Sequence, residues 1–465
     1  MNQSVTEIVF DSRNIIPDSL FVAVRGTQTD GHQYIMQAIE KGAKVIVAET
    51  FEEINITGIV FLRVKDSHDA LALMAANFYD HPSEKLKLIG VTGTNGKTTF
   101  VSMYAALINR LGFKCGLLST IENKIGEEIL PSTHTTPDPL SINLLLHQMI
   151  EKGCTHCTME ISSHAIVQKR IASLHFTGAV FTNITHDHLD YHLTFRNYLD
   201  AKKAFFDQLQ ETAFALVNAD DKHSAFMVQN TKAMKKTYGI RNLSDFKGRI
   251  IENDFNGLHL LIDGHDFHSD KIGSFNAQNI MAVYGAAVLS GIEKEKVLQI
   301  LSVPTRVEGR FELISKSKKY LAILDYAHTP DALMNVIRTI NEIKKGEVNL
   351  ITVFGCGGNR DKTKRPEMGK IASEMSDQII ITSDNPRNED PHQIIREIEE
   401  GVSENRKDRM LVIAEREMAI KTACKIAKEG DIVLVAGKGH EKYQEVSGVK
   451  YPFDDKEIVL KYLKS

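Results

Sequence analysis

Short apolar runs alternate with longer amphipathic stretches through most of this chain. In its middle part the apolar runs lie at 86–92, 115–119, 157–161, 179–183 and 214–218, and an amphipathic stretch follows each of them. Parallel strands that are buried on both faces have continuous apolar sequences and are connected by helices. The pattern therefore predicts a doubly wound α/β sheet in this part of the chain.

Two further blocks flank the middle one. Near Arg310 the alternation starts again, with predicted strands at 320–325, 348–354, 378–382, 410–414 and 432–436. The first 85 residues hold shorter apolar runs and end at His81-Pro82-Ser83, a sequence typical of a linker. A polar segment at 222–273, in which 254–266 resembles short antiparallel strands, precedes a predicted helix at 277–290, and we assign both to the middle block.

The length and composition agree with three domains. A chain of 465 residues is about three times the length of a typical domain of ~150 residues. With 42% hydrophobic and 25% charged residues, the composition is that of a globular protein. We expect a smaller N-terminal α/β domain (1–85), a central domain with a doubly wound, P-loop-type sheet (86–303) and a Rossmann-like C-terminal domain (304–465).

Charge and cysteine content exclude several classes of protein. The 56 basic and 60 acidic side chains give a net charge of -4, which provides no footprint for nucleic acid or an anionic membrane. Neither a leader sequence nor an apolar run of about 18 residues is present, so we expect a cytoplasmic protein without membrane insertion. The five scattered cysteines should be reduced thiols, and Cys154 and Cys157 lack the second pair that a zinc site needs, so they are predicted to lie in a buried strand.

The sequence from Leu88 to Thr99 passes from a predicted strand through a glycine-rich turn into a predicted helix. The turn and the first helical positions are Gly93, Thr94, Asn95, Gly96, Lys97, Thr98 and Thr99. Backbone N–H groups of such a turn bind phosphate, the lysine neutralises it, and the threonine hydroxyl reaches Mg²⁺. Although Val91 stands where the strict P-loop pattern has glycine, the context predicts a site for a nucleoside triphosphate.

Carboxylate and imidazole side chains follow two neighbouring predicted strands. Glu160 ends one strand, and His186, His188 and His192 follow the other. Beside a phosphate loop, these groups suit a Mg²⁺ ion that bridges ATP and a second anion. Two alternatives stay open: a zinc site built from the three histidines, and purely structural roles for His186 and His192. Lys202 lies on an amphipathic helix, and the pattern alone predicts a solvated side chain.

Two arginines lie in loops that follow strands of the last block. Arg360 is in one loop and Arg387 in the next, and the acids Asp384 and Glu441 are in post-strand loops of the same block. A guanidinium group can bind a carboxylate through two parallel hydrogen bonds. Because ligands bind at the carboxyl ends of strands in open α/β sheets, we expect a pocket here for a small zwitterion.

Five motifs, in order along nearly the whole chain, resemble those of the Mur ligase family. They are Gly93-Thr94-Asn95-Gly96-Lys97-Thr98-Thr99, Glu160-Ile161-Ser162-Ser163-His164, 183–192, Tyr326-Ala327-His328-Thr329-Pro330-Asp331 and Asp384-Asn385-Pro386-Arg387. The resemblance implies an ATP-dependent, Mg²⁺-requiring ligase of bacterial cell-wall synthesis. It would add meso-diaminopimelate to the D-glutamate of UDP-N-acetylmuramoyl-L-alanyl-D-glutamate through an acyl phosphate, releasing ADP and phosphate.

The resemblance also implies roles for individual residues. The N-terminal domain would bind the UDP moiety through Phe10, Ser12, Thr27, Gln28 and Thr29. The muramoyl-peptide would contact Thr135, Thr136, Ser162, Gln168 and Arg170. The nucleotide would contact Asn279, Arg310 and Asp325 in addition to the phosphate loop. The implied catalytic residues are Lys97, Glu160, His188 and a carbamylated Lys202, and the implied metal ligands are Thr98, Glu160, His188 and Lys202. The diaminopimelate pocket would consist of Arg360, Asp384, Asn385, Pro386, Arg387, Gly437 and Glu441.

Competing hypotheses make different use of these residues. The nearest is an L-lysine-adding ligase of the same family, whose members usually lack an arginine at the position of Arg387. A folylpolyglutamate-forming ligase would lack the UDP-type N-terminal module. A regulatory ATPase or a non-catalytic UDP-sugar binding protein would leave the two-arginine pocket without a function, so detection of an amide product separates these classes.

Overall fold

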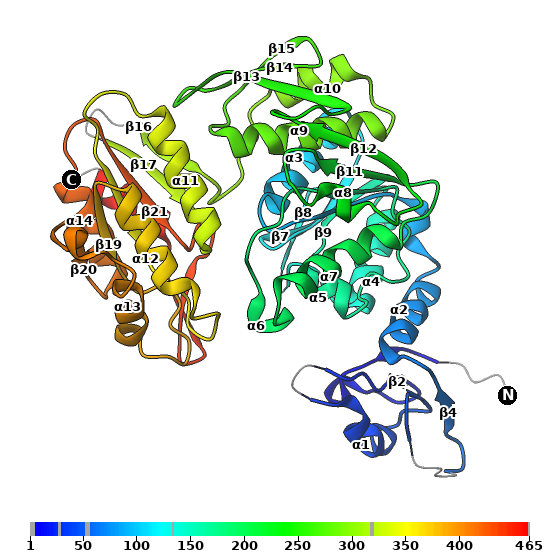
Figure 1. Ribbon diagram of the computed structural model, residues 1–465. Coiled ribbons are helices and arrows are strands. Elements are labelled where there is room, and N and C mark those ends of the chain that lie inside the picture. The colour runs from blue at the N-terminus through cyan, green and yellow to red at the C-terminus, as the bar shows by residue number, and fades with distance from the viewer. Residues whose placement is uncertain (1–4, 27–28, 52–55, 133, 317–319, 464–465) are drawn as a thin grey trace.

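Three α/β domains follow one another along the chain in the computed structural model, as the sequence predicts (Figure 1). The structure describes residues 5–26, 29–51, 56–132, 134–316 and 320–463. In Figure 1 the N-terminal domain lies below the central domain, and the C-terminal domain lies to the left of the central domain. The residues at which one domain gives way to the next stay predictions.

The N-terminal domain is built on a four-stranded parallel sheet with the order β1-β2-β3-β4. Its strands are β1 (Ile8–Val9), β2 (Leu20–Val22), β3 (Val45–Ala48) and β4 (Val60–Arg63). Two small apolar clusters lie in this domain, one containing Ala38 of α1 (Ile35–Glu40) and the other Leu71 of α2 (Ser67–Phe78).

The central domain contains an eleven-stranded mixed sheet with a parallel middle. The five predicted strands are confirmed within two residues at either end. They are β5 (Lys87–Thr92), β6 (Cys115–Leu118), β9 (His156–Glu160), β10 (Gly178–Phe181) and β11 (Phe214–Asn218). Each face has its own core, with α3 (Lys97–Arg110) and α9 (Ser274–Leu289) in one, and α4 (Pro139–Glu151) and α7 (Phe195–Asp207) in the other.

Antiparallel strands extend both edges of this sheet. The polar segment after the parallel strands forms β13 (Phe246–Asp254), β14 (Gly257–Ile262) and β15 (His265–Ser269), which belong to the same eleven-stranded sheet. At the other edge, β7 (Glu122–Ile125) and β8 (Glu128–Pro131) form a hairpin that the pattern did not predict. The strand β12 (Met234–Gly239), between β11 and β13, was also missed.

The C-terminal domain has a six-stranded sheet with the order β16-β17-β21-β18-β19-β20. The strands are β16 (Glu312–Lys316), which is antiparallel, and β17 (Tyr320–Asp325), β18 (Leu350–Phe354), β19 (Gln378–Ile381), β20 (Met410–Val412) and β21 (Asp431–Ala436), which are parallel. One face is covered by α11 (Pro330–Ile343), α12 (Lys364–Met375) and α13 (Pro391–Glu399), and the other by α14 (Arg416–Ile426) and α15 (Asp455–Leu463).

The loops at the carboxyl ends of the parallel strands bring polar side chains of the central and C-terminal domains together. Loops that follow β5, β9 and β10 line one side of a shared cleft, and loops that follow β17, β18, β19 and β21 line the other. Among the residues that the structure describes, no helix is long and apolar enough to cross a membrane.

Candidate active site

A cleft of about 610 Å³ lies between the central and C-terminal domains. Most of the chemically distinctive residues predicted from the sequence line it. They are 93–99, Thr135, Glu160, Ser162, His188, Lys202, Arg310, Arg360, Asp384, Asn385, Arg387, Gly437 and Glu441. Pro386 does not line this cleft, although its loop does.

The phosphate loop connects β5 to the first turn of α3. At Gly96 the backbone has a φ of 90°, and a Cβ atom there would lie 2.5 Å from the Asn279 Oδ1, so glycine is needed at this position. The Lys97 ammonium donates to the carbonyl oxygens of Gly93 (2.8 Å) and Thr94 (2.9 Å). Burial lowers the pKa of Lys97, while Glu160 opposes that shift. The loop thus presents a cation and a helix N-terminus to the cleft, as an anion site requires.

Arg310 joins the beginning of the C-terminal domain to the phosphate loop. Its Nη2 donates to the Thr98 Oγ1 at 3.1 Å, and its guanidinium carbon lies 4.6 Å from the centre of the Tyr326 ring. Next to it, the buried carboxylate of Asp325 accepts the backbone N–H of Phe311 at 2.7 Å. Arg310, Asp325 and Asn279 all line a second pocket of about 270 Å³ that adjoins the phosphate loop. The three predicted nucleotide contacts therefore lie together.

Glu160 lies at the end of β9 and is 1% exposed. Its two carboxylate oxygens accept the backbone N–H (3.0 Å) and the hydroxyl (3.1 Å) of Thr120. Thr120 was not singled out in the sequence, because it follows β6 without any motif around it. Its two hydrogen bonds fix the orientation of the carboxylate in the wall of the cleft.

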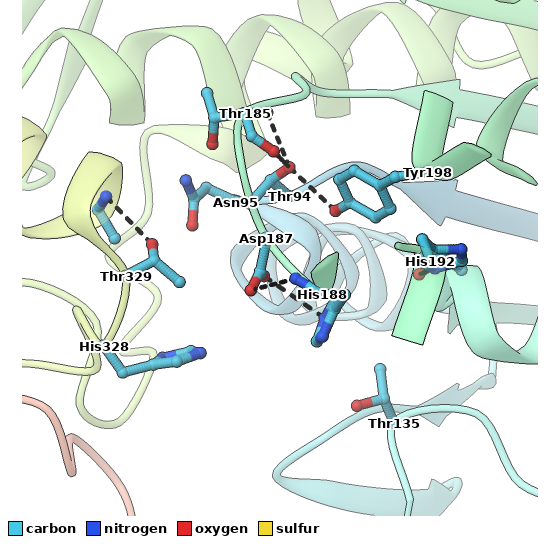
Figure 2. Close-up of polar contacts among 12 residues, drawn as sticks. Thr94, Asn95, Thr135, Thr185, Asp187, His188, His192, Tyr198, His328 and Thr329 are labelled. Carbon is cyan, nitrogen blue, oxygen red and sulfur yellow. Dashed lines mark hydrogen bonds and ion pairs between the residues drawn. The ribbon is translucent and has the colours of Figure 1, made fainter. Parts of the chain in front are cut away.

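Imidazole and phenol rings gather around His188. Its backbone N–H donates to the Asp187 Oδ1 at 2.9 Å, and its Nε2 lies 3.4 Å from the Asp187 Oδ2 (Figure 2). Burial holds the pKa of His188 well below its ordinary value although Asp187 opposes the shift. His192 is buried, and its Nε2 lies 2.9 Å from the Ser163 Oγ. On the facing C-terminal domain, His328 and Thr329 lie across the opening from Asp187 (Figure 2).

Lys202 is buried, and the prediction from the helix pattern was wrong. Its side chain is 1% exposed, and its Nζ donates to the carbonyl oxygen of Gly93 at 2.9 Å. Burial and the neighbouring Lys97 lower the pKa of Lys202 well below its ordinary value. The pattern failed because α7 packs against the end of β5, so that its inner face covers part of the polar cleft as well as the apolar core.

The residues expected to contact the muramoyl-peptide form one hydrogen-bonded group. Thr136 donates its hydroxyl to the Glu160 carbonyl (2.8 Å) and accepts the backbone N–H of Ser162 (3.0 Å). Arg170 donates to the Thr136 carbonyl (2.7 Å) and, through two nitrogens, to the Gln168 Oε1. The Thr135 Oγ1 lies 3.0 Å from the Thr120 Oγ1, the hydroxyl that donates to Glu160. This group continues the wall of the cleft beside Glu160.

The expected UDP contacts lie in the N-terminal domain and do not line the cleft. Ser12 is buried and donates to the Gln37 Oε1 at 3.1 Å. Phe10 is 37% exposed, and the carbonyl of Thr29 accepts the backbone N–H of Gly26. Thr27 and Gln28 lie outside the described residues. The structure brings Phe10, Ser12 and Thr29 into the same domain, and their binding role stays a prediction.

The C-terminal side of the cleft contains a buried network of charged and amide groups. Asn385 donates to the Glu441 Oε2 at 2.7 Å, and its Oδ1 accepts from Lys438 at 2.9 Å. Lys438 is fully buried, and Tyr326 donates to the other oxygen of Glu441 at 3.3 Å. The Asp384 Oδ2 is buried and finds no hydrogen-bond partner among the described residues. Burial raises the pKa of Asp384, but nearby Lys438 opposes this shift and holds the pKa below its ordinary value.

The two arginines reach the same part of the cleft from adjacent loops. Arg387, with a φ of 52°, donates from Nη1 to the Gly358 carbonyl at 2.8 Å, and its Nε lies 3.4 Å from the Glu445 Oε2. Its backbone pairs with β22 (Tyr443–Val446) of a hairpin that the sequence pattern missed. Arg360 is exposed, and its guanidinium makes one long contact, 3.5 Å, with the Asn359 carbonyl. Arg360 is thus available to a carboxylate ligand, whereas Arg387 lines the cleft with the Glu445 carboxylate already near its Nε.

A direct hydrogen bond links the phosphate loop to the C-terminal domain. The Asn95 Nδ2 donates to the Asp331 Oδ2 at 2.9 Å, and Asp331 lies in the first turn of α11. The sequence predicts no role for Asp331, although it lies in one of the five motifs. Lys438 was also missed, although it lies between Gly437 and Glu441, which were expected in the diaminopimelate pocket.

The cysteines and histidines do not form a metal-binding cluster. Cys157 is buried in β9, as predicted, and Cys154 is buried just before that strand. Within the described ranges, no three His, Cys, Asp or Glu side chains group so that they could hold a metal ion. The three-histidine zinc alternative therefore has no ligand set here.

Three family models match the chain: Mur ligase family, catalytic domain, over residues 4–79; Mur ligase middle domain, over 91–287; and Mur ligase, glutamate ligase domain, over 309–439. A relative from Cytophaga hutchinsonii, named UDP-N-acetylmuramoyl-L-alanyl-D-glutamate--2,6-diaminopimelate ligase, is 54% identical over 460 residues, covering 99% of this chain and 94% of its own. A solved structure with the same ligase name has a TM-score of 0.68 and 32% identity, covering 99% of this chain and 95% of the other. The fold is also that of a MurF ligase from Thermotoga maritima in complex with ADP, with a TM-score of 0.64 and 19% identity over 98% and 97% of the two chains.

Proposed function

Because the chain belongs to the Mur ligase family, we propose that it is the ATP-dependent ligase that adds meso-diaminopimelate to UDP-N-acetylmuramoyl-L-alanyl-D-glutamate. One observation carries the proposal. A single cleft joins a phosphate loop on the central domain to a pocket with two arginines, the buried Asp384 and the half-buried Glu441 on the C-terminal domain. An enzyme that activates one carboxylate with ATP and then presents an amino acid to it needs this combination.

The chemistry explains why ATP is required. A free carboxylate does not react with an amine, because oxide would have to leave. Transfer of the γ-phosphoryl group of ATP to the D-glutamyl γ-carboxylate forms an acyl phosphate and ADP. The amine of diaminopimelate then attacks the acyl carbon, the C–O bond to phosphate breaks, and the amine proton is released. Lys97 and the N-terminus of α3 are placed to neutralise the negative charge that moves in the first step.

The residues present suit Mg²⁺, which supplies charge neutralisation for phosphoryl transfer when it is bound. Thr98, Glu160 and His188 all line the cleft, and the pKa of His188 is low enough to keep its ring neutral, as a metal ligand must be. Since protein side chains supply few ligands here, phosphate oxygens would complete the coordination. The oxygen donors of Thr98, Glu160 and the phosphates are of the kind that Mg²⁺ prefers, and His188 is the one nitrogen ligand in the proposed set.

Lys202 is proposed to carry a carbamate. Its burial and low pKa favour the neutral amine, which can attack CO₂ and lose a proton to give an N-carboxylate. This converts a buried neutral amine next to Lys97 into an anion that could bind a second Mg²⁺. The attraction between that anion and the Lys97 ammonium is a physical reason for the modification, and the family resemblance is the other.

The pocket on the C-terminal domain explains the choice of amino acid. Diaminopimelate differs from lysine by a second carboxylate at its distal end, and a free guanidinium group is the side chain that best binds it. Arg387 and Arg360 provide two guanidinium groups that line the cleft, and Arg360 is the one without a carboxylate near it among the described residues. The unpartnered Asp384 Oδ2 is available to an ammonium group of the same ligand. The L-lysine-adding alternative would give neither arginine a ligand carboxylate to bind.

The remaining contacts assign the other substrate parts. Phe10, Ser12 and Thr29 are proposed to bind the UDP moiety, and the network of Thr136 and Arg170 the muramoyl-peptide. Since the reacting groups come from two domains, turnover requires their closure, and the Asn95–Asp331 bond is one contact across that boundary.

The five buried, free thiols fit a reducing compartment, and we propose a cytoplasmic enzyme.

The test is the requirement for all three substrates. ADP release and formation of the UDP-linked tripeptide are measured with UDP-muramoyl-dipeptide and meso-diaminopimelate, and again with each substrate omitted. We expect one ADP per amide and almost no ADP without the amino acid, because the acyl phosphate is protected from water in the closed site. Fast ATP hydrolysis without amino acid, or ADP release without an amide product, would contradict the proposal.

A further inference from the structure

The two loops that carry the arginines of the pocket are joined directly to each other. The Arg360 loop (355–363) follows β18, and the Arg387 loop (382–390) follows β19. The Gly358 N–H donates to the Asn385 carbonyl at 2.9 Å, and Arg387 donates back to the Gly358 carbonyl at 2.8 Å. A Cβ atom at Gly358 would lie 2.0 Å from the Pro386 carbonyl oxygen. The spacing between the arginines is therefore set by a close backbone contact.

Glu389 reaches from one loop to the other. One of its carboxylate oxygens accepts the backbone N–H of Asn359, next to Arg360. The same carboxylate accepts two hydrogen bonds from the guanidinium group of Arg365, both at 3.0 Å. Arg365 is fully buried and also donates to the Gly357 carbonyl at 3.3 Å. Arg365 lies in the first turn of α12, so the Glu389–Arg365 pair connects the Arg387 loop to both ends of the Arg360 loop.

The electrostatics favour a permanent ion pair. The pKa of Glu389 is lowered to about 2, mainly by the hydrogen bonds from Arg365. The carboxylate is therefore ionised at every working pH. Charge-assisted, bidentate contacts of this kind are the strongest and most directional hydrogen bonds in proteins. The pair is thus suited to hold two loops in one arrangement.

Glu397 provides a comparison within the same cluster. Its Oε2 accepts from the Arg365 Nη1 at 2.6 Å, and its Oε1 accepts from Gln393 at 3.0 Å. Glu397 belongs to α13, and in the described part of the chain its carboxylate bonds to neither arginine loop. The two acids share one guanidinium, but one of them also contacts the pocket loops.

We propose that Glu389 is a positioning residue for amino-acid recognition: with Arg365, it sets the spacing of Arg360 and Arg387 and thereby the fit of the second carboxylate of the substrate. This inference rests on the proposed function, in which both arginines bind diaminopimelate. A carboxylate held by two guanidinium groups tolerates little displacement, because charge-assisted hydrogen bonds need short distances and aligned donors. An amide in place of the carboxylate would leave one acceptor oxygen for the Asn359 N–H and the two Arg365 donors, and its NH₂ group would face the guanidinium, which loosens both loops.

The test compares Glu389→Gln with the matched control Glu397→Gln in the full-length enzyme. Each variant removes one carboxylate from Arg365, so their effects on general stability should be similar. For Glu389→Gln we expect a rise of about tenfold in the KM for diaminopimelate, with kcat and the KM for ATP changed by less than about twofold. For Glu397→Gln we expect the KM for diaminopimelate to change by less than about twofold. Amide hydrogen exchange should become faster at 357–359 and 385–388 in Glu389→Gln alone.

The outcomes distinguish a failure of the positioning role of Glu389 from a failure of the proposed function. Equal changes in KM for both variants, or unchanged exchange of the loop amides in Glu389→Gln, would overturn the positioning role. A fall in kcat with an unchanged KM for diaminopimelate would also overturn it. If the wild-type enzyme did not turn over diaminopimelate at all, the proposed function would fail instead, and the exchange contrast between the variants would decide the positioning role.

Discussion

Asp325 is a buried carboxyl group, and its negative charge lowers the free energy of unfolding. It lies at the end of β17, is 7% exposed, and accepts the backbone N–H of Phe311. Burial raises its pKa from an ordinary 3.8 to about 6, although Arg310 opposes the shift. The change to consider is Asp325→Asn, which keeps the shape and the acceptor for Phe311 but carries no charge at any pH.

The size of the effect follows from the two pKa values. Since the raised pKa means that the folded state holds the proton more tightly than the unfolded state, stability falls as pH rises from about 4 to about 6 and is level above that range. The difference between the two values corresponds to roughly 3 kcal/mol. Asp325→Asn should therefore raise the free energy of unfolding by up to about 3 kcal/mol at pH 8 and by about half as much at pH 5.

Differential scanning calorimetry of the full chain measures this difference. We expect the transition of the C-terminal domain to rise by up to about 10 °C at pH 8 and by about 5 °C at pH 5. The kcat/KM for ATP should fall by about tenfold or more, because the carboxylate next to Arg310 in the nucleotide pocket is lost. A stability difference that is the same at both pH values, or a less stable Asn variant, would refute the reasoning.

Two further predictions concern a buried cation and a strained turn. Lys202→Met should lower amide formation by at least about 100-fold. The melting temperature should stay equal or rise, because a desolvated amine is replaced by an apolar chain. Intact-mass spectrometry under CO₂ should show the added CO₂ in the wild type and not in the variant, and an active Lys202→Met would contradict the account. Leu193 is 79% exposed and has a φ of 64°. Leu193→Gly should therefore raise the free energy of unfolding by about 1 kcal/mol in thermal unfolding, whereas Leu193→Ala, which keeps the unfavourable backbone conformation, should not. Equal gains in both variants would argue against backbone strain.

The parallel strands were predictable because burial on both faces makes them continuous apolar runs. The ends of β5, β9 and β17, and hence the positions of Glu160 and Asp325, followed from that pattern alone. The hairpin β7–β8 could not be found in this way, because its strands have only four residues each and Glu122–Ile125 alternates too briefly to give a period. The hairpin that holds Arg387 was missed for the same reason.

The site was predictable where a motif lies directly after a strand. The phosphate loop and the Asp384–Arg387 loop both satisfy that condition, and the structure places both in one cleft. Contacts between segments distant in sequence were not predictable. Thr120, which orients Glu160, has no motif around it, and the pairing of Glu389 with Arg365 depends on how two loops pack. Lys202 shows the limit of periodicity, because a helix face that covers a polar cleft has the same pattern as one that faces water.

The most direct test of the central claim is the amino-acid preference of the wild type and of Arg387→Ala. The kcat/KM for ADP release is measured with UDP-muramoyl-dipeptide as acceptor and with meso-diaminopimelate or L-lysine as the amino acid. We predict that diaminopimelate supports turnover in the wild type far better than lysine, and that Arg387→Ala lowers its kcat/KM by about 100-fold with little change for lysine. Equal or better turnover with lysine in the wild type, or an unchanged preference in Arg387→Ala, would contradict the assignment of the arginine pocket.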